Sequence, residues 1–296
     1  MTGPSSPRLV GSGDELRDAF AAYAGRTALV PTMGALHAGH AALMTHARAV
    51  VGPDAPLVVS VFVNPMQFAP GEDLDRYPRT LDADLALCAD HGVDLVLAPA
   101  VEEVYPGGEP EVTVAPGPLG AELEGASRPT HFRGVLTVVA KLFGLVRPDV
   151  AVFGEKDYQQ LALVRRMAAD LCLGVEVLGA PTVREPDGLA LSSRNRFLDA
   201  AQRQHAVALS RALRAAADAA ADGPDAALAA AHAVLDGAPG VDLDYLALRG
   251  PDLGPAPAAG PARLLVAARL GATRLIDNAG LELGATRPVP ATPGGR

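Results

Sequence analysis

Short apolar runs alternate with helix-like segments in the first part of the chain, up to about residue 180. The runs are rich in Val, Leu and Ala, which is typical of buried strands. They lie at 27–32, 57–63, 93–98, 150–153 and 175–178, and the helical segments lie at 41–50, 81–91, 134–146 and 158–173. Strands that alternate with crossover helices predict a parallel sheet with both faces covered, a doubly wound α/β domain.

The pattern changes after Asp187. Ala-rich stretches predict helices at 200–221 and 225–235, and β-branched or alternating stretches predict strands at 241–248, 263–270 and 274–277, with a Gly/Pro loop between them. These elements predict a smaller α+β domain. We therefore expect domains at 1–186 and 187–287, followed by a disordered tail at 288–296.

Composition narrows the class of protein. A length of 296 residues fits two domains, and a hydrophobic content of 49% excludes a disordered chain. The net charge of -9 disfavours a broad nucleic-acid surface. The sequence shows neither a membrane-length apolar run nor a signal peptide, so we expect a cytoplasmic protein. We interpret Cys88 and Cys172 as small core residues.

The segment PTMGALHAGH, residues 31–40, carries the sharpest chemical signal. It leaves a predicted strand and enters a helix that bears His37 and His40. Ligands of open α/β sheets bind beyond the carboxyl ends of the strands, and a helix N-terminus offers free N–H groups to phosphate. Gly39 lets a ligand approach the backbone, and the imidazoles can donate to phosphate oxygens. Capping or packed histidines, or two ligands of a zinc ion, remain alternatives.

Polar side chains also follow other predicted strands. The segment SVFVNPMQF, residues 60–68, places Asn64 and Gln67 at the carboxyl edge, and FGEKDYQQL, residues 153–161, places Lys156 there. Amides can both donate to and accept from a ligand with a carboxylate and hydroxyls, and a lysine can act as a point charge on a triphosphate. A strand-ending Asn-Pro turn, surface Gln and Lys residues, and serines that cap a helix near Asp199 remain the alternatives.

A His-x-Gly-His motif after the first strand resembles the signature of the nucleotidylyltransferase superfamily. The longer segment 31–40 is similar to the first motif of the pantothenate synthetase (pantoate–β-alanine ligase) family. Four further segments, at 60–68, 128–139, 153–161 and 181–195, match that family in the same order. The sequence departs from the family pattern at Thr130, where Gly is common, and at Leu191, where Met is common. Both departures concern loop geometry.

The resemblance implies a Rossmann-like sheet of the nucleotidylyltransferase type with a smaller C-terminal domain. It implies ATP-dependent condensation of (R)-pantoate with β-alanine through pantoyl adenylate, with release of AMP and pyrophosphate. Mg²⁺ is expected to arrive with ATP, without a dedicated metal site, and the resemblance suggests a homodimer that binds neither nucleic acid nor membrane. Another nucleotidylyltransferase, or a non-catalytic nucleotide-binding relative, is the alternative.

The resemblance also implies roles for individual residues. The expected catalytic residues are His40, His37 and Lys156. ATP is expected to contact Met33, Gly34, Ala35, Leu36, His37, Ala38, Gly39, His40, Gly154, Glu155, Lys156, Asp157, Val183, Leu191, Ser192, Ser193 and Arg194. Pantoate is expected at Gln67, Gln160, Val138 and Val139, and β-alanine at Gln67, Asn64 and Tyr77. The serine segment 192–194 stands where aminoacyl-tRNA synthetases carry the KMSKS loop, and we expect the second domain to close over the nucleotide.

Overall fold

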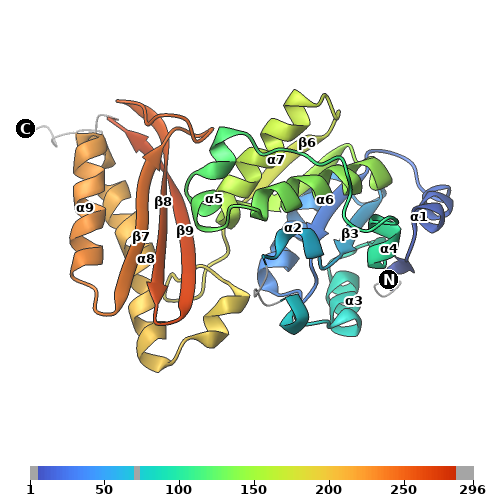
Figure 1. The fold of residues 1–296 in the computed structure, drawn as a ribbon, viewed down its shortest axis with the longest axis horizontal. Coiled ribbons are helices and arrows are strands. Elements are labelled where there is room, and N and C mark those ends of the chain that lie inside the picture. The colour runs from blue at the N-terminus through green and yellow to red at the C-terminus, as the bar shows by residue number, and fades with distance from the viewer. Residues whose placement is uncertain (1–5, 70–73, 285–296) are drawn as a thin grey trace, which may run out of the picture. The chain divides into compact units, whose positions relative to one another are not determined.

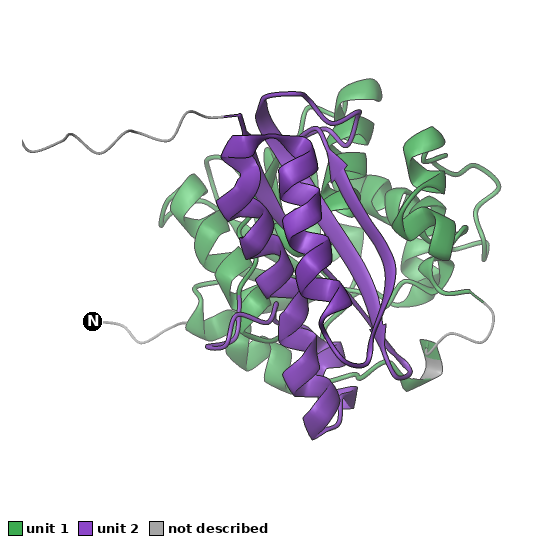
Figure 2. Cartoon of the chain, turned by 90° about the vertical axis from the view of Figure 1, so that its left-hand side faces the viewer, with its two compact units in different colours: residues 1–183 green, residues 184–296 purple. Residues whose placement is uncertain are grey.

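The computed structural model describes residues 6–69 and 74–284 of the chain. It divides into two compact units, Met1–Val183 and Arg184–Arg296, which Figure 2 distinguishes by colour. The division falls slightly before the boundary that the sequence predicts between residues 186 and 187. The predicted tail at 288–296 lies outside the described residues.

Unit 1 is built on a six-stranded sheet in which every paired strand is parallel to its neighbour (Figure 1). The order is β1-β4-β3-β2-β5-β6. The strands are β1 (Arg8–Val10), β2 (Ala28–Thr32), β3 (Leu57–Val61), β4 (Leu95–Leu97), β5 (Val150–Gly154) and β6 (Glu176–Ala180). This confirms the predicted doubly wound sheet. The edge strand β1 was not predicted, because three residues are too few to show a pattern.

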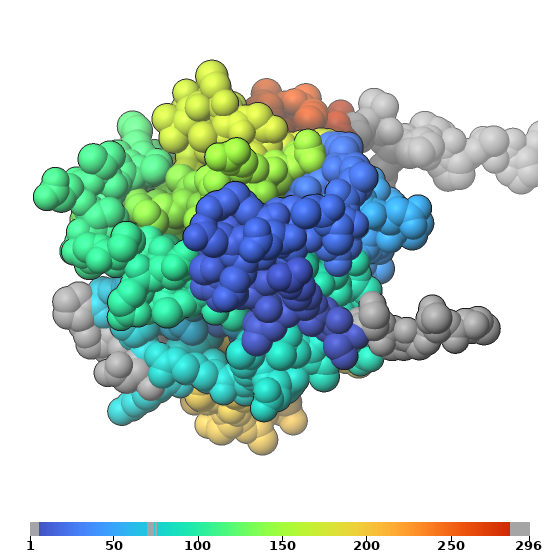
Figure 3. Space-filling view, turned by 90° about the vertical axis from the view of Figure 1, so that its right-hand side faces the viewer, coloured from blue at the N-terminus to red at the C-terminus, as the bar shows by residue number. Residues whose placement is uncertain are grey.

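Both faces of this sheet are buried under helices. One face packs against α2 (Ala38–Val51) and α3 (Leu81–Asp90), through residues such as Met44 and Cys88. The alternating residues of the strands, among them Leu29 and Val58, are fully buried on the other side, where α6 (His131–Val146) and α7 (Tyr158–Asp170) lie. Helix α1 (Gly13–Phe20) contacts α6, and its blue residues form part of the surface in Figure 3.

Short helices complete unit 1. They are α4 (Val101–Val104), α5 (Glu124–Ser127) and the 3₁₀ turns Pro65–Gln67, Leu74–Arg76, Pro118–Ala121 and Glu155–Asp157. The predicted long helices begin and end close to the observed bounds. One core prediction is wrong: Cys88 is buried, but Cys172 is exposed, because it follows the end of α7 at a left-handed position with φ 52°.

Unit 2 is a three-stranded antiparallel sheet with two helices on one face (Figure 1). Its elements are a 3₁₀ turn at Ser193–Phe197, α8 (Ala200–Ala219), a 3₁₀ turn at Ala220–Asp222, α9 (Pro224–Asp236), β7 (Val241–Arg249), β8 (Gly260–Leu270) and β9 (Thr273–Leu283). The α+β prediction is confirmed. Strand β9 is much longer than the predicted 274–277, since it pairs with β8 along its whole length, and Asn278 and Gly280 obscure its alternation.

The order of the strands creates a switch point in unit 1. From β2 the chain proceeds outward to β3 and β4, and it then returns to β5 on the opposite side of β2. In an open parallel sheet, the crevice beyond the carboxyl ends at such a reversal is where ligands bind. The loops after β2 and β5 therefore flank the expected ligand site. Among the described residues, none of the helices is both long and apolar enough to cross a membrane.

A glycine on α6 allows this helix to approach the turn after β3. A Cβ atom at Gly134 would overlap the Met66 carbonyl oxygen and would lie 2.7 Å from the Gln67 nitrogen, whereas one at Gly144 on the same helix would meet no atom within 4 Å. We expect Gly134→Ala to lower the free energy of unfolding by about 1–3 kcal/mol through overpacking. The matched control Gly144→Ala should raise it by roughly 0.5–1 kcal/mol. Urea unfolding checks both, and equal effects would contradict the close approach.

Candidate active site

A buried carboxylate on α3 shapes the loop between β2 and α2. Asp84 is 2% exposed, and its two oxygens accept hydrogen bonds from the N–H groups of Ala35 (3.1 Å) and Leu36 (2.8 Å). Thr32 Oγ1 accepts the next bond from Gly34 N (3.1 Å) and donates to the Ser60 carbonyl oxygen (2.6 Å). Three successive N–H groups of the loop are therefore bound within the protein.

The turn depends on Gly34, whereas the sequence singled out Gly39 for the approach of a ligand to the backbone. Gly34 has φ 81°, and an added Cβ would lie 3.0 Å from both the Asp84 carboxylate and the Val61 side chain. Gly34 therefore combines a left-handed backbone with close packing, both of which exclude larger residues. Ala35 also has a positive φ, of 51°.

The two histidines form a capping box at the start of α2. His37 Nδ1 accepts a hydrogen bond from Gly39 N (3.1 Å), and His40 Nδ1 accepts one from His37 N (3.3 Å). A neutral imidazole that accepts at Nδ1 carries its proton on Nε2. The rings, whose centroids are 4.2 Å apart, thus keep two Nε2–H donors for a ligand. The two histidines do cap the helix, as one of the alternatives held. Because the caps use only Nδ1, the hypothesis that the imidazoles donate to phosphate remains open.

This arrangement changes which groups are expected to donate hydrogen bonds to a phosphate. The sequence predicted free backbone N–H groups at the helix N-terminus, but the N–H groups of His37 and Gly39 are bound by the imidazoles. These two N–H groups are not free for a ligand, because a histidine side chain reaches the same orphan donors that a phosphate would bind. The imidazole Nε2 atoms take over as the candidate donors.

The environment keeps both rings neutral. Burial lowers the pKa of His40 to about 4, with a smaller contribution from the neighbouring His37 ring, while Asp157 opposes this shift. Burial also lowers the pKa of His37, and the charge of Lys156 lowers it further. Strand β5 pairs in parallel with β2, so the loop after β5 leaves the same edge of the sheet beside the loop after β2.

Helix α7, which follows β5, begins with two neighbouring glutamines that lie in different environments. Gln159 is 2% exposed, and its Nε2 donates to the carbonyl oxygens of Leu119 and Glu122, both at 2.8 Å. Its Oε1 accepts from Glu124 N at 2.9 Å. Gln160 is partly exposed on the same helix. Gln159 therefore holds the 119–124 loop, and Gln160 remains the candidate ligand of the pair.

The turn after β3 is organised by Asn64, which is 1% exposed. Its Oδ1 accepts from the Tyr105 hydroxyl (2.9 Å) and from Met66 N (3.3 Å). Its Nδ2 donates to the Gly134 carbonyl oxygen and to Gln67 Oε1, both at 3.1 Å. These bonds occupy both amide hydrogens of Asn64. They favour Asn64 as a residue that positions Gln67, and its contact with β-alanine stays a prediction.

The bonds around Asn64 fix the orientation of the Gln67 amide. Since Gln67 Oε1 accepts from Asn64, its Nε2 faces the other way and donates to Met33 Sδ at 2.8 Å. The main chain is held as well, because the Gln67 carbonyl oxygen contacts Arg128 Nη2 (3.2 Å) and His131 Nδ1 (3.1 Å). Gln67 therefore presents N–H donors on the side of Met33.

Other predicted site residues lie near these two loops. Tyr77 packs edge-on against Phe68, the residue that follows Gln67 in the chain, and the centroids of the two rings are 6.1 Å apart. Val138 and Val139 are buried on α6. Thr130 precedes α6 with φ -96°, so a threonine fits there without the backbone strain that would demand glycine.

The remaining predicted residues lie at the division of the chain. Val183 is the last residue of unit 1, whereas Leu191, Ser192, Ser193 and Arg194 belong to unit 2. Ser192 Oγ accepts from Arg194 N at 3.3 Å and caps the 3₁₀ turn. Ser193 and Arg194 are exposed, and Leu191 and Ser192 are partly exposed.

Sequence reasoning missed three residues that shape this site: Asp84, Tyr105 and Arg128. A lone Asp on a helix, or a lone Tyr just after one, carries no signal of the groups that it will meet across the fold. Their roles depend on contacts between distant segments. Tyr105 lies 41 positions from its partner Asn64, and Arg128 lies 61 positions from its partner Gln67. No local pattern encodes such contacts.

The parallel sheet, its switch point and the strand-end histidines define an α/β enzyme fold of the nucleotidylyltransferase type. The family model described as pantoate-beta-alanine ligase matches residues 8–280. The chain belongs to the pantoate–β-alanine ligase family.

Relatives support this assignment. A pantothenate synthetase of Nocardioides sp. is 63% identical over 96% of this chain and 88% of its own length. The crystal structure of pantothenate synthetase from Thermus thermophilus has a TM-score of 0.83 and 52% identity, over 92% of this chain and 98% of that one. A pantoate-beta-alanine ligase from Francisella tularensis, complexed with beta-gamma ATP and beta-alanine, has a TM-score of 0.74 and 31% identity, over 96% and 100% of the chains.

The capping box makes a prediction about protonation. At pH 7 both rings should be neutral with the proton on Nε2, and His40 should titrate at about 4. The unfolded chain takes up this proton near the ordinary value of 6.5. Between these two values the unfolded state binds more protons, so the contribution of His40 to the free energy of unfolding falls as the pH is lowered.

Nitrogen-15 NMR of labelled histidine side chains measures both properties, with His37→Gln and His40→Gln for assignment. A cationic His40 at pH 7, or a neutral ring with its proton on Nδ1, would contradict the capping geometry.

Proposed function

We propose that this chain catalyses the ATP-dependent condensation of (R)-pantoate with β-alanine to pantothenate, with release of AMP and pyrophosphate. Membership of the pantoate–β-alanine ligase family supports this proposal. So does the Francisella relative, whose complex contains an ATP analogue and β-alanine. The observation that carries it is the pair of Nε2–H donors beside Lys156 at the switch point of the sheet.

In the proposed first step, the pantoate carboxylate attacks the α-phosphorus of ATP. The bond from that phosphorus to the bridging oxygen breaks, and pyrophosphate leaves with the electron pair. Catalysis of such a transfer rests on positioning and on stabilising the charge of the phosphoryl oxygens. His37 and His40 would donate from Nε2 to these oxygens without transferring a proton, since both rings are neutral. Lys156 would supply the permanent positive charge.

The ATP site in this proposal has three parts. The first is the loop after β2 and the start of α2, comprising Met33, Gly34, Ala35, Leu36, His37, Ala38, Gly39 and His40. The second is the loop after β5, comprising Gly154, Glu155, Lys156 and Asp157. The third comprises Val183, the last residue of unit 1, and Leu191, Ser192, Ser193 and Arg194 of unit 2. Hydroxyls and a guanidinium in the third part suit the β- and γ-phosphates.

The pantoate site would use the donor side of Gln67. An Nε2–H group fixed by Asn64 suits a carboxylate or hydroxyl oxygen, which accepts hydrogen bonds. Gln160 would bind the other end of pantoate, and Val138 or Val139 would form the apolar wall for its dimethyl carbon. In the second step the β-alanine amine attacks the acyl carbon and AMP leaves. Gln67, Asn64 and Tyr77 are the candidates for the β-alanine end.

The divalent metal of this reaction would be Mg²⁺ brought by ATP. Among the residues that the structure describes, no three His, Cys, Asp or Glu side chains form a group that could hold a metal ion. Phosphate and water oxygens are the ligands that Mg²⁺ commonly uses in nucleotide sites. The metal would neutralise phosphate charge and help pyrophosphate to leave. A homodimer in the cytoplasm remains part of the proposal, and sedimentation equilibrium reports the oligomer.

Product analysis tests the function directly. The purified chain is incubated with ATP and Mg²⁺, with and without pantoate and β-alanine, and AMP, pyrophosphate and pantothenate are measured. We expect AMP release only when both substrates are present, with pantothenate formed in equal amount. ATP left intact, or cleaved regardless of pantoate, would refute the assignment. Pyrophosphate exchange that needs pantoate but not β-alanine would identify the adenylate step.

Tyr105→Phe tests how Gln67 is oriented. The change removes one of two donors to Asn64 Oδ1, so the amides of Asn64 and Gln67 become freer to flip. Loss of a hydrogen bond of about 1 kcal/mol corresponds to roughly a fivefold rise in KM for pantoate. KM for ATP should stay unchanged, and Tyr23→Phe is a control for losing a tyrosine hydroxyl elsewhere in unit 1. Steady-state kinetics that show equal rises for both substrates would contradict this orienting role.

A further inference from the structure

The serine segment 191–194 follows a tight hairpin at the start of unit 2. Arg184 and Ala190 pair across this hairpin as an antiparallel bridge. Inside it, Glu185 N donates to the Leu189 carbonyl oxygen and Gly188 N donates to the Glu185 carbonyl oxygen, both at 2.8 Å. Gly188 has φ 97°, which the turn requires. The chain therefore enters the serine segment from a defined structure.

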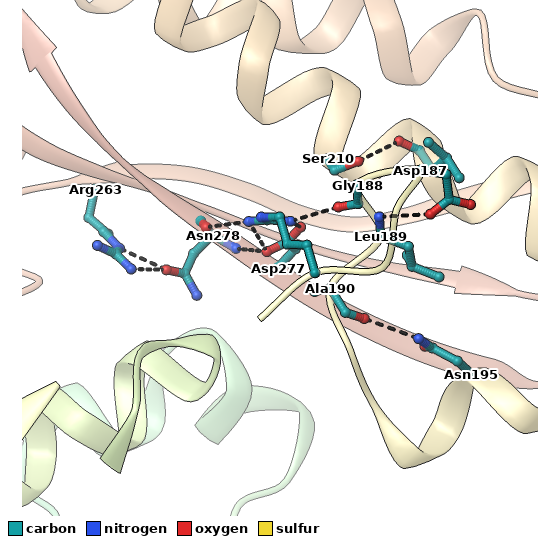
Figure 4. Close-up of polar contacts among 11 residues, drawn as sticks. Asp187, Gly188, Leu189, Ala190, Asn195, Ser210, Arg263, Asp277 and Asn278 are labelled. Atoms are coloured by element: carbon teal, nitrogen blue, oxygen red, sulfur yellow. Dashed lines mark hydrogen bonds and ion pairs between the residues drawn. The ribbon is translucent and has the colours of Figure 1, made fainter. Parts of the chain in front are cut away.

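A charged pair fixes this hairpin to the sheet of unit 2. Arg184 donates to both oxygens of Asp277 on β9, at 2.7 and 3.0 Å, and also to the Gly188 carbonyl oxygen at 3.1 Å. Asp277 is 3% exposed, and one of its oxygens accepts Asn278 N at 2.8 Å. Figure 4 shows Asp277 and Asn278 beside the hairpin. A two-bond guanidinium–carboxylate contact sets direction as well as distance.

Helix α8 holds the other side of the hairpin. Arg203 donates to Glu185 and to Asp187, both at 2.6 Å. The hydrogen bond from Arg203 lowers the pKa of the Asp187 carboxyl and favours its charged form. The hairpin is therefore tied to two different elements of unit 2, β9 and α8.

The side-chain amide of Asn195 joins the two ends of the serine segment. Asn195 Nδ2 donates to Glu185 Oε1 at 2.8 Å. It also donates to the Ala190 carbonyl oxygen at 3.1 Å, as Figure 4 shows. Ala190 and Asn195 flank residues 191–194, so both ends of the segment are joined to the hairpin. Ser192, Ser193 and Arg194 form a short loop with fixed ends.

We propose that Arg184, Asp277 and Asn195 are positioning residues that fix the serine segment to unit 2, so that it meets the nucleotide as a preorganised part of that unit. The backbone entropy of residues 191–194 is then lost on folding and not on nucleotide binding, which strengthens binding. This inference rests on the proposed contact of Ser192, Ser193 and Arg194 with the phosphates. The position of this loop then follows the position of unit 2.

Asn195→Ala is the main test. It removes the two hydrogen bonds from Asn195 to the hairpin and leaves the ion pair between Arg184 and Asp277 in place. We expect KM for ATP to rise about tenfold, which corresponds to 1.4 kcal/mol, with KM for pantoate unchanged. Amide hydrogen exchange at 191–194 should become faster, while exchange in β8 and β9 stays the same. Arg184→Lys, which keeps the charge but loses the two-bond geometry, should act in the same direction.

Two controls separate positioning from general stability. Asp244→Asn removes another ion pair of the same sheet, with Arg274, and should leave KM for ATP unchanged. Asp277→Asn keeps the shape of the buried side chain; if it does not fold, Asn195→Ala and Arg184→Lys still decide the question. Unchanged exchange at 191–194, or faster exchange with KM for ATP within twofold of the parent, would overturn the inference.

Arg194→Ala distinguishes this inference from the proposed function. If Arg194→Ala raises KM for ATP and Asn195→Ala does not, the phosphate role stands and the positioning inference fails. If Arg194→Ala leaves ATP kinetics unchanged, the phosphate role of the segment fails, and the inference that depends on it fails with it.

Discussion

The buried carboxylate of Asp84 is the contact on which the rest of the candidate site depends. It accepts two successive N–H groups of the loop after β2, and this fixes the turn at Gly34 from which α2 begins. Because α2 begins there, His37 Nδ1 can accept from Gly39 N and His40 Nδ1 from His37 N, which leaves the protons of both neutral rings on Nε2. The neutrality of the rings follows from their burial at this position. The imidazoles bind two N–H groups of this segment, so their Nε2 atoms are the candidate donors to phosphate.

The same principle operates at the turn after β3 and at the start of unit 2. In each place a side-chain amide donates two hydrogen bonds inside the protein and so fixes a neighbouring group that is assigned to a ligand. Asn64 fixes the amide of Gln67, and Asn195 joins the ends of the serine segment. Two donated bonds specify the orientation of each amide. The hydrogen bonds of Asn64 and Asn195 therefore hold in place the groups that are assigned to substrates.

Much of the fold could be predicted because its pattern is local. The apolar runs of β2, β3 and β5 and the helical segments of α2 and α6 show their period within a few residues. The prediction was poorer where the pattern is weak: β1 is too short, and β9 contains Asn278 and Gly280 in place of clear alternation. Cys172 was misplaced because its apolar neighbours belong to α7, while the residue itself lies beyond the end of that helix. For the candidate site, the segments after β2, β3 and β5 were identified from polar residues at strand ends, but their supports were not.

The amino-acid sequence alone was enough to establish the fold class, the family and the segments that carry the chemistry, since all three are written in continuous motifs such as residues 31–40. How the polar atoms of these segments are held was decided only by folding. The tautomer of His37, the direction of the Gln67 amide, the burial of Gln159 and the role of Asp84 each depend on a bond to a backbone or side-chain group brought close by folding. The reason is physical: a motif specifies which groups are present, whereas the burial and hydrogen bonding of those groups, which set their protonation and orientation, are properties of the packed chain.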